Sequence, residues 1–230
     1  MTAVRASLDD GVGRIVIDQP PLNILTRQLL AQLRQELDAL ASARELRALL
    51  ITAEGEHFSA GADVGEHLPP EHERMIPEFV ATVAAIDAFP LPVIAVVRGR
   101  CLGGGFEVAL AADLIVAAEG ALFGQPEIML GVLPPAACAL LPERCPPGVA
   151  AELVLTGDPI EAGDAERVGL VRYVVPDERL ESAASELAAR IARHSAATLR
   201  VAKRALRSGA TERRAAALAE CGKVYVDDLM

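Results

Sequence analysis

The feature that most constrains this 230-residue chain is an apolar strand that leads through three consecutive glycines into a helix. Residues 92–97 (PVIAVV) contain no polar side chain, which is typical of a strand that is covered on both faces. Gly103, Gly104 and Gly105 follow, and residues 106–112 have a helical pattern. These residues therefore predict an α/β fold in which a buried strand ends close to a helix N-terminus.

The three glycines also predict a place where a ligand can meet the backbone. Glycine has no Cβ to keep a ligand away, and the first N–H groups of a helix are free and lie at the positive end of its dipole. Such a site suits an anion, or an oxygen that becomes one during a reaction. Glu107 lies three residues after Gly104 and hence on the same helix face. We expect an N–H donor and a carboxylate to face one ligand here.

Two other short segments carry related signals. Residues 58–63 (FSAGAD) are mostly small and follow a strand, so they expose backbone N–H groups as well. In residues 123–127 (FGQPE), Pro126 stiffens the loop and makes it a rigid mount for Glu127.

Each of these features has a plain structural alternative when it is taken alone. Glycines before a helix often serve packing or generic phosphate binding, Glu107 could simply favour the helix dipole, and Glu127 could be a solvated loop residue. Ser59 has neither a GxSxG motif nor a His–Asp constellation to make it a nucleophile. Val108 occupies the third glycine position of the dinucleotide fingerprint, which argues against that motif.

The remaining pattern predicts mixed strands and helices, followed by a helical last third. Thr26 is a suitable N-cap for the first helix. The segment at 66–77 contains prolines and polar residues, which predicts a surface loop or loose helix and a candidate mobile flap. The expected strands are 14–18, 47–52, 114–117 and 170–175. The expected helices are 27–42, 78–88, 149–156, 177–193, 196–208 and 211–226. We divide the chain into a core at 1–176 that contains the active site and a helical segment at 177–230.

Composition excludes several classes of function. The formal net charge of −10 makes nucleic acid an unsuitable partner. No apolar run approaches the ~18 residues that cross a bilayer, and the N-terminus has no apolar signal core, so we expect a cytoplasmic protein with no membrane partner. The four histidines and four cysteines match no metal motif, so no metal is expected.

Taken together, the motifs resemble the enoyl-CoA hydratase/isomerase (crotonase) superfamily. The resemblance runs from about Gly13 to Met230, and its motifs occur in the family's order. PPLNIL, FSAGADVGEHLPP and VVRG further resemble the cyclohexa-1,5-diene-1-carbonyl-CoA hydratase subgroup. The matching stretches are 21–25 (PLNIL), 57–64 (HFSAGADV), 93–131 and 152–175.

The resemblance implies a spiral of ββα turns with a helical C-terminal segment that forms trimers or dimers of trimers. It implies that the N–H groups of Ala62 and Gly104 bind the thioester carbonyl as an oxyanion hole. Glu107 and Glu127 are the paired carboxylates that handle the water. Since isomerases of this superfamily generally manage with one carboxylate, the pair favours hydration.

The resemblance also implies how coenzyme A is held. Leu22, Ala60 and Val64 resemble part of the coenzyme A nucleotide pocket, and Gly103 is also expected among the residues that bind the substrate. Asp63 is similar to the family's GAD aspartate, whose role we interpret as structural although it belongs to the binding segment. Coenzyme A is part of the substrate, so no separate cofactor is expected.

The predicted protein is therefore an enzyme, an enoyl-CoA hydratase acting on an unsaturated acyl-CoA, for which a cyclic dienoyl-CoA is one candidate. Two alternatives remain open: an isomerase or decarboxylase on the same fold, and a non-catalytic acyl-CoA-binding subunit. The helix at 196–208 carries four basic residues, for which ligand phosphates and a solvated amphipathic face are both reasonable explanations. These residues are Arg200, Lys203, Arg204 and Arg207.

Overall fold

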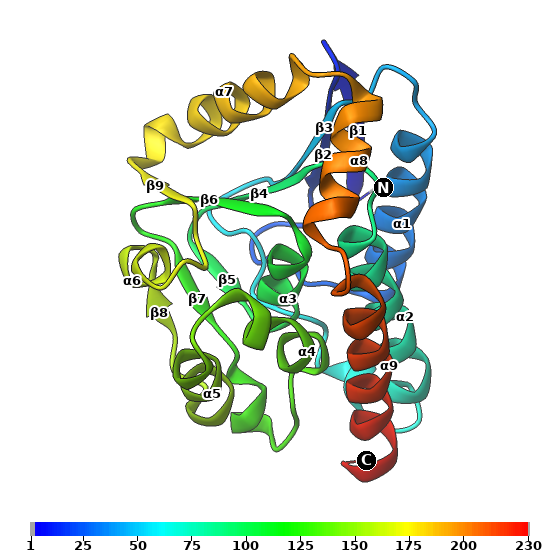
Figure 1. The fold of residues 1–230 in the computed structure, drawn as a ribbon. Helices are drawn as coiled ribbons and strands as arrows, with labels where there is room; N and C mark the ends of the chain where they lie inside the picture. The colour runs from blue at the N-terminus through cyan, green and yellow to red at the C-terminus, as the bar shows by residue number, and fades with distance from the viewer. Residues whose placement is uncertain (1–2, 230) are drawn as a thin grey trace.

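A computed structural model describes residues 3–229, and its main feature is a six-stranded sheet (Figure 1). The strand order is β1-β2-β3-β4-β6-β9. β1 and β2 form an antiparallel hairpin, and every later neighbour pair is parallel. The bounds are β1 Val4–Asp9, β2 Val12–Ile17, β3 Ala48–Ala53, β4 Val93–Val97, β6 Leu114–Ala118 and β9 Tyr173–Val175.

The hairpin that opens the sheet was not predicted from the sequence. Asp10 and Gly11 connect its strands with φ values of 48° and 80°. An Asp-Gly pair with both φ values positive is a preferred two-residue hairpin turn, because its twist matches that of the strands. The Asp-Gly dipeptide is therefore the sequence signal that could have predicted the hairpin and with it β1.

A smaller three-stranded sheet has the order β5-β7-β8. β5 runs parallel to β7, and β8 antiparallel to it. The sequence predicted none of these strands, which are two or three residues long and have no readable periodicity. Their bounds are β5 Arg100–Leu102, β7 Leu122–Gly124 and β8 Ile160–Glu161.

The helices agree with the predicted ones in most places. The Thr26 hydroxyl accepts a hydrogen bond from the Leu29 N–H at 3.2 Å, which confirms the predicted N-cap. The α-helices are α1 Arg27–Ala41, α2 His72–Asp87, α3 Gly104–Ala111, α4 Pro135–Arg144, α5 Pro147–Thr156, α6 Ala162–Arg167, α7 Leu180–Ala192, α8 Ala196–Leu206 and α9 Thr211–Asp228. Short 3-10 turns are η1 Gly65–His67, η2 Pro126–Leu130 and η3 Asp177–Arg179. α4 and α6 were not predicted.

The segment at 66–77 was predicted as a surface loop or a loose helix, and its second half is regular helix. The next helix was predicted to begin at residue 78, which is wrong, because α2 begins at His72. Pro77 lies inside α2 and has no backbone N–H to donate. The preceding residues of the helix, Met75 and Ile76, are buried. Burial of this apolar face outweighs the lost hydrogen bond.

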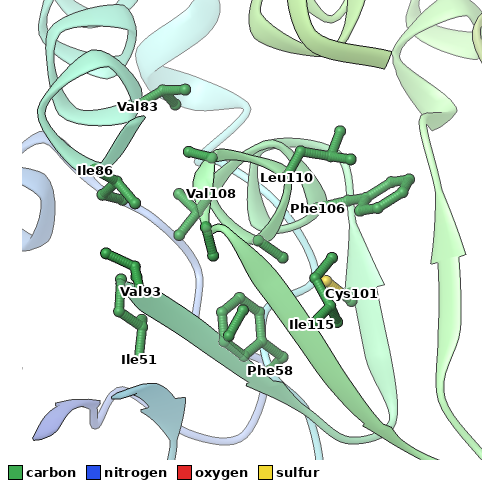
Figure 2. Packing of buried hydrophobic residues seen from close by; sticks show 14 of the residues in the cluster. Ile51, Phe58, Val83, Ile86, Val93, Cys101, Phe106, Val108, Leu110 and Ile115 are labelled. Atoms are coloured by element: carbon green, nitrogen blue, oxygen red, sulfur yellow. The ribbon is translucent and has the colours of Figure 1, made fainter. Parts of the chain in front are cut away.

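The strand predicted to be covered on both faces is confirmed as β4. Val93, Ala95 and Val97 belong to a large apolar cluster, whereas Ile94 and Val96 belong to a second one. Figure 2 shows the large cluster, in which side chains of α3, α2 and the sheet meet. α7 covers the other face of the sheet (Figure 1). The division between a core at 1–176 and a segment at 177–230 stays a prediction, and α7 packs on the core sheet.

The last two helices are attached to the body in different ways. α9 packs beside α2 and α4 (Figure 1). α8 is held by buried ion pairs: Lys203 Nζ lies 2.6 Å from an Asp113 oxygen, and Arg207 contacts Asp113 at 2.6 Å and Asp87 at 2.9 Å. The phosphate-binding interpretation is therefore wrong for Lys203 and Arg207, because their charges are already neutralised inside the protein.

Within residues 3–229, no helix combines the length and apolar character needed to cross a membrane.

Candidate active site

The strand–glycine–helix junction is built so tightly that only glycine fits. Gly103 is the N-cap of α3 with φ of 51°, a left-handed conformation that disfavours side chains. A Cβ on Gly105 would lie 2.6 Å from Ser59 Cβ, and a Cβ on Gly103 would lie 2.6 Å from Glu127 Oε1. The glycines thus bring the loop that contains Ser59 and the carboxylate of Glu127 against the start of α3.

Ala62 and Gly104 are neighbours, as expected of two donors to one oxygen. A Cβ built on Gly104 would lie 3.3 Å from Ala62 Cβ. Leu25 fixes the loop, because its N–H donates to Gly61 O at 2.9 Å and its carbonyl accepts from Asp63 N at 3.1 Å. Among residues 3–229, neither the Ala62 nor the Gly104 N–H donates to a protein acceptor. Both amides are available to a ligand, and their convergence on one oxygen stays a prediction.

Glu107 lies on α3 and is only 2% exposed. Its Oε1 accepts hydrogen bonds from Ala136 N at 2.6 Å and Ala137 N at 2.9 Å, the first free N–H groups of α4. Burial raises the pKa of Glu107 from its ordinary value of 4.5 to about 7, and the two N–H donors oppose this rise. The helix N-terminus therefore keeps a buried carboxyl within reach of ionisation at neutral pH.

Glu127 lies in η2 and has a different environment. Its Oε2 is buried and has no hydrogen-bond partner among the described residues. Burial raises the pKa of Glu127 well above its ordinary value, and the nearby charge of Glu107 raises it further. Since Glu107 has two N–H donors to stabilise a negative charge, we assign the shared proton of the pair to Glu127 and the charge to Glu107.

A cavity of about 350 Å³ opens beside these groups. Five of the predicted site residues lie in its wall, and three of the wall residues have polar side chains: His67, Glu127 and Tyr225. The rest of the wall is apolar or backbone, as expected for an acyl chain. The described wall consists of Ala60, Gly61, Ala62, Val64, His67, Leu68, Gly103, Pro126, Glu127, Leu130, Val132 and Tyr225.

Four predicted residues are not among those that line the cavity. Gly104 and Glu107 are buried on α3 next to the wall. The Leu22 carbonyl accepts from Ala60 N at 2.9 Å and so supports the loop that carries Ala60. Asp63 Oδ1 accepts from Glu66 N at 3.0 Å, a bond that shapes the turn into η1.

Sequence reasoning missed Tyr225 and His67. Tyr225 comes from α9 and is 1% exposed, and its ring lies 5.9 Å from the ring of His67, edge to face. The helical pattern of α9 predicts that Tyr225 is on a buried face, but which cavity it reaches depends on how α9 packs. The two N–H donors of α4 were missed as well, although Pro134 and Pro135 are a typical start signal for a helix.

Within the described chain, no group of three or more His, Cys, Asp or Glu side chains is arranged to hold a metal ion. All four cysteines are free. The expectation that the reaction needs no separate cofactor stays a prediction.

Comparisons with known proteins identify the family of this chain. The Enoyl-CoA hydratase/isomerase family model matches residues 7–227. The cyclohexa-1,5-dienecarbonyl-CoA hydratase of Thauera aromatica is 40% identical over 96% of this chain and 86% of its own length. The 2,3-dehydroadipyl-CoA hydratase of Escherichia coli (strain K12) is 38% identical over 80% of this chain and 73% of its own.

A solved structure shows the same fold. The crystal structure of an enoyl-CoA hydratase/isomerase from Xanthobacter autotrophicus Py2 has a TM-score of 0.91 and 30% sequence identity, and the match covers 97% of this chain and 86% of that one. The predicted α/β fold of crotonase type is thereby confirmed. With a matching family model over nearly all of its length, a 40% identical relative and the same fold, the chain belongs to the enoyl-CoA hydratase/isomerase family.

Proposed function

We propose that this protein is a hydratase that adds water across the double bond next to the carbonyl of an acyl-CoA thioester. The observation that carries the proposal is the pair of buried carboxyls, Glu107 and Glu127, in unequal surroundings. One accepts two N–H hydrogen bonds and the other has an unpartnered oxygen at the cavity wall. Such an unequal pair suits a reaction that needs one base and one acid at the same time.

The thioester carbonyl is bound by the free N–H groups of Ala62 and Gly104. These donors lie where the substrate oxygen gains negative charge as the double bond is attacked, and such a donor is typically worth ~10²–10³ in rate. Glu107 takes a proton from the water as its oxygen bonds to the β carbon. Glu127 gives its proton to the α carbon, so the protons balance and the hydroxyacyl thioester forms.

Coenzyme A enters along the loop that carries Ala60, Ala62 and Val64. Leu22 supports this loop from behind, and Gly103 forms the wall beside the thioester. Val64 is 57% exposed, which suits a side chain that an adenine ring covers. Resemblance to the Thauera aromatica relative favours a cyclic dienoyl thioester as the acyl group.

We further propose a cytoplasmic homotrimer or dimer of trimers. The chain exposes large apolar side chains on α8, Val201 at 53% and Leu206 at 88%, and on η2, Met129 at 63% and Leu130 at 64%. Association would remove this apolar surface from water. Light scattering that reports an active monomer at working concentration would contradict the assembly.

The function is tested by product analysis with crotonyl-CoA and with a cyclic dienoyl-CoA. The expected product is the thioester plus one water, whereas an isomerase would return an unchanged mass. A decarboxylase would convert neither thioester, because neither has a free carboxylate to lose. A chain that binds both thioesters and converts neither would be a decarboxylase or a non-catalytic subunit, contrary to the proposal.

The roles of the two carboxyls are tested by Glu107→Gln and Glu127→Gln. Each change keeps the side-chain shape but removes the acid–base group, so hydration should fall by ~10²–10⁴. Affinity for coenzyme A, measured by calorimetry, should stay close to the wild-type value. Near-wild-type hydration by either variant would remove that residue from the mechanism.

A further inference from the structure

The hydroxyl of Tyr225 is a buried donor without a partner. Within the described residues the Tyr225 oxygen makes no hydrogen bond, although the residue is 1% exposed and lines the cavity beside Glu127. Leaving a buried hydroxyl unsatisfied is costly, so such a group in a cavity wall indicates that a bound molecule supplies the partner.

Several backbone donors around the two carboxyls are already in use, and the free N–H groups of Ala62 and Gly104 are assigned to the thioester carbonyl. α4 begins next to Glu107, but Pro134 and Pro135 have no N–H, and the Ala136 and Ala137 N–H groups both donate to Glu107. The Gly103 N–H donates to Gly124 O at 2.9 Å.

His67 is another wall side chain with a polar hydrogen. Its Nδ1 lies 2.7 Å from the Asp63 carbonyl oxygen, which can only accept. That bond places the proton of the neutral ring on Nδ1 and leaves Nε2 as an acceptor. Apart from the protonated Glu127 itself, Tyr225 is therefore the side chain of the described wall that can donate a hydrogen bond near the paired carboxyls.

The electrostatic surroundings keep this phenol in its donor form. Burial raises the pKa of Tyr225 to about 12, and the charges of Glu127 and Glu107 contribute to the rise. At neutral pH the group therefore holds its proton, and the negative charge shared by the two carboxyls favours turning that proton toward them.

We propose that the Tyr225 hydroxyl donates a hydrogen bond to the oxygen of the water that is added, and to the same oxygen in the hydroxyacyl product. This inference rests on the proposed hydration and adds a third contact to it. In the resting complex the water gives one hydrogen to Glu107 and one lone pair to Tyr225, so its other lone pair faces the β carbon. The phenol keeps its own proton throughout: the water proton goes to Glu107, and the α-carbon proton comes from Glu127.

The test is Tyr225→Phe, which removes the hydroxyl and keeps the packed ring. Hydration by the whole protein should fall about 10- to 100-fold in kcat, the range expected when a hydrogen bond to a reacting oxygen is lost. KM should change little, because the unsaturated substrate has no hydroxyl for Tyr225 to bind. The matched control is Tyr173→Phe, the other tyrosine of the chain, which lies in β9 outside the cavity wall and should hydrate like the wild type.

Binding gives a readout that is separate from the rate of hydration. Tyr225→Phe should weaken binding of 3-hydroxybutyryl-CoA about 5- to 10-fold, as expected for the loss of one hydrogen bond, and leave the affinity for butyryl-CoA unchanged. Equal effects on both ligands would mean that Tyr225 is only part of the acyl wall and would overturn the inference, as would wild-type kcat in the variant. A wild-type protein that hydrates neither test thioester would contradict the proposed function instead, and the binding comparison would still decide the role of Tyr225.

Discussion

The raised pKa of Glu107 predicts that Glu107→Gln stabilises the protein above neutral pH. Burial raises this pKa from 4.5 in the unfolded chain to about 7 in the folded protein. Between these pH values the folded protein binds the proton more tightly, so its stability falls as pH rises through this window and is constant again above it. Each pKa unit is worth about 1.4 kcal/mol, so the loss is about 3 kcal/mol.

The Gln side chain does not titrate and therefore avoids this loss. Its carbonyl oxygen can still accept from the Ala136 and Ala137 N–H groups, so the local structure is kept. Urea unfolding at fixed protein concentration and at pH 5, 6, 7 and 8 measures the effect. The free energy of unfolding of the variant, minus that of the wild type, should rise by about 2.5 kcal/mol from pH 5 to pH 8, since part of the effect lies below pH 5. A difference that stays flat with pH would refute the assignment of a buried, titrating carboxyl.

Glu143→Gln is the matched control, for which the change of stability with pH should have the opposite sign. Burial raises the pKa of Glu143, but hydrogen bonds and charges from Arg214 and Arg213 outweigh it and lower the pKa overall. This group therefore stabilises the fold above its unfolded pKa and loses that contribution as pH falls. Its Gln variant should be less stable than the wild type at pH 8 and approach it in acid, and it should hydrate normally.

Two further changes test the structure around the site. Gly103→Ala places a Cβ 2.6 Å from Glu127 Oε1 at a φ of 51°, so kcat should fall at least 10-fold, and a wild-type kcat would contradict the close approach. Asp113→Ala leaves the buried Lys203 and Arg207 without a shared partner and should lower the free energy of unfolding by about 3 kcal/mol, measured in urea; a loss below about 1 kcal/mol would show that α8 is held by other contacts.

Much of the fold was predictable from the sequence because its signals are local. β4 and α1 have clear apolar patterns, and the cap at Thr26 lies within the same few residues as the helix it starts. The short strands β5, β7 and β8 have no such pattern, since two or three residues cannot show a period. α2 was predicted to start too late because Pro77 suggests a boundary, while the burial that overrides it is a tertiary effect.

The motifs of the site were predictable from the sequence, but the difference between its two glutamates and the contribution of Tyr225 were not. The glycine run, the loop of Ala62 and the two glutamates are each recognisable in one dimension. What makes the two glutamates unequal is the N-terminus of α4, which begins near residue 135 and contributes no side chain to the reaction. Tyr225 reaches the cavity because α9 packs against α2 and α4, and no short sequence motif predicts this contact.

The division of labour between the two carboxyls follows from this packing. Alone, two buried glutamates beside one cavity would both be protonated, and the site would have an acid but no base. The two N–H groups at the start of α4 stabilise one negative charge, and both bind the same oxygen of Glu107. Among residues 3–229, Glu127 has no comparable donor at Oε2, so the charge on Glu107 acts to keep the proton on Glu127. One helix N-terminus thus converts a chemically symmetric pair into a base and an acid, which is the asymmetry that adding water to a double bond requires.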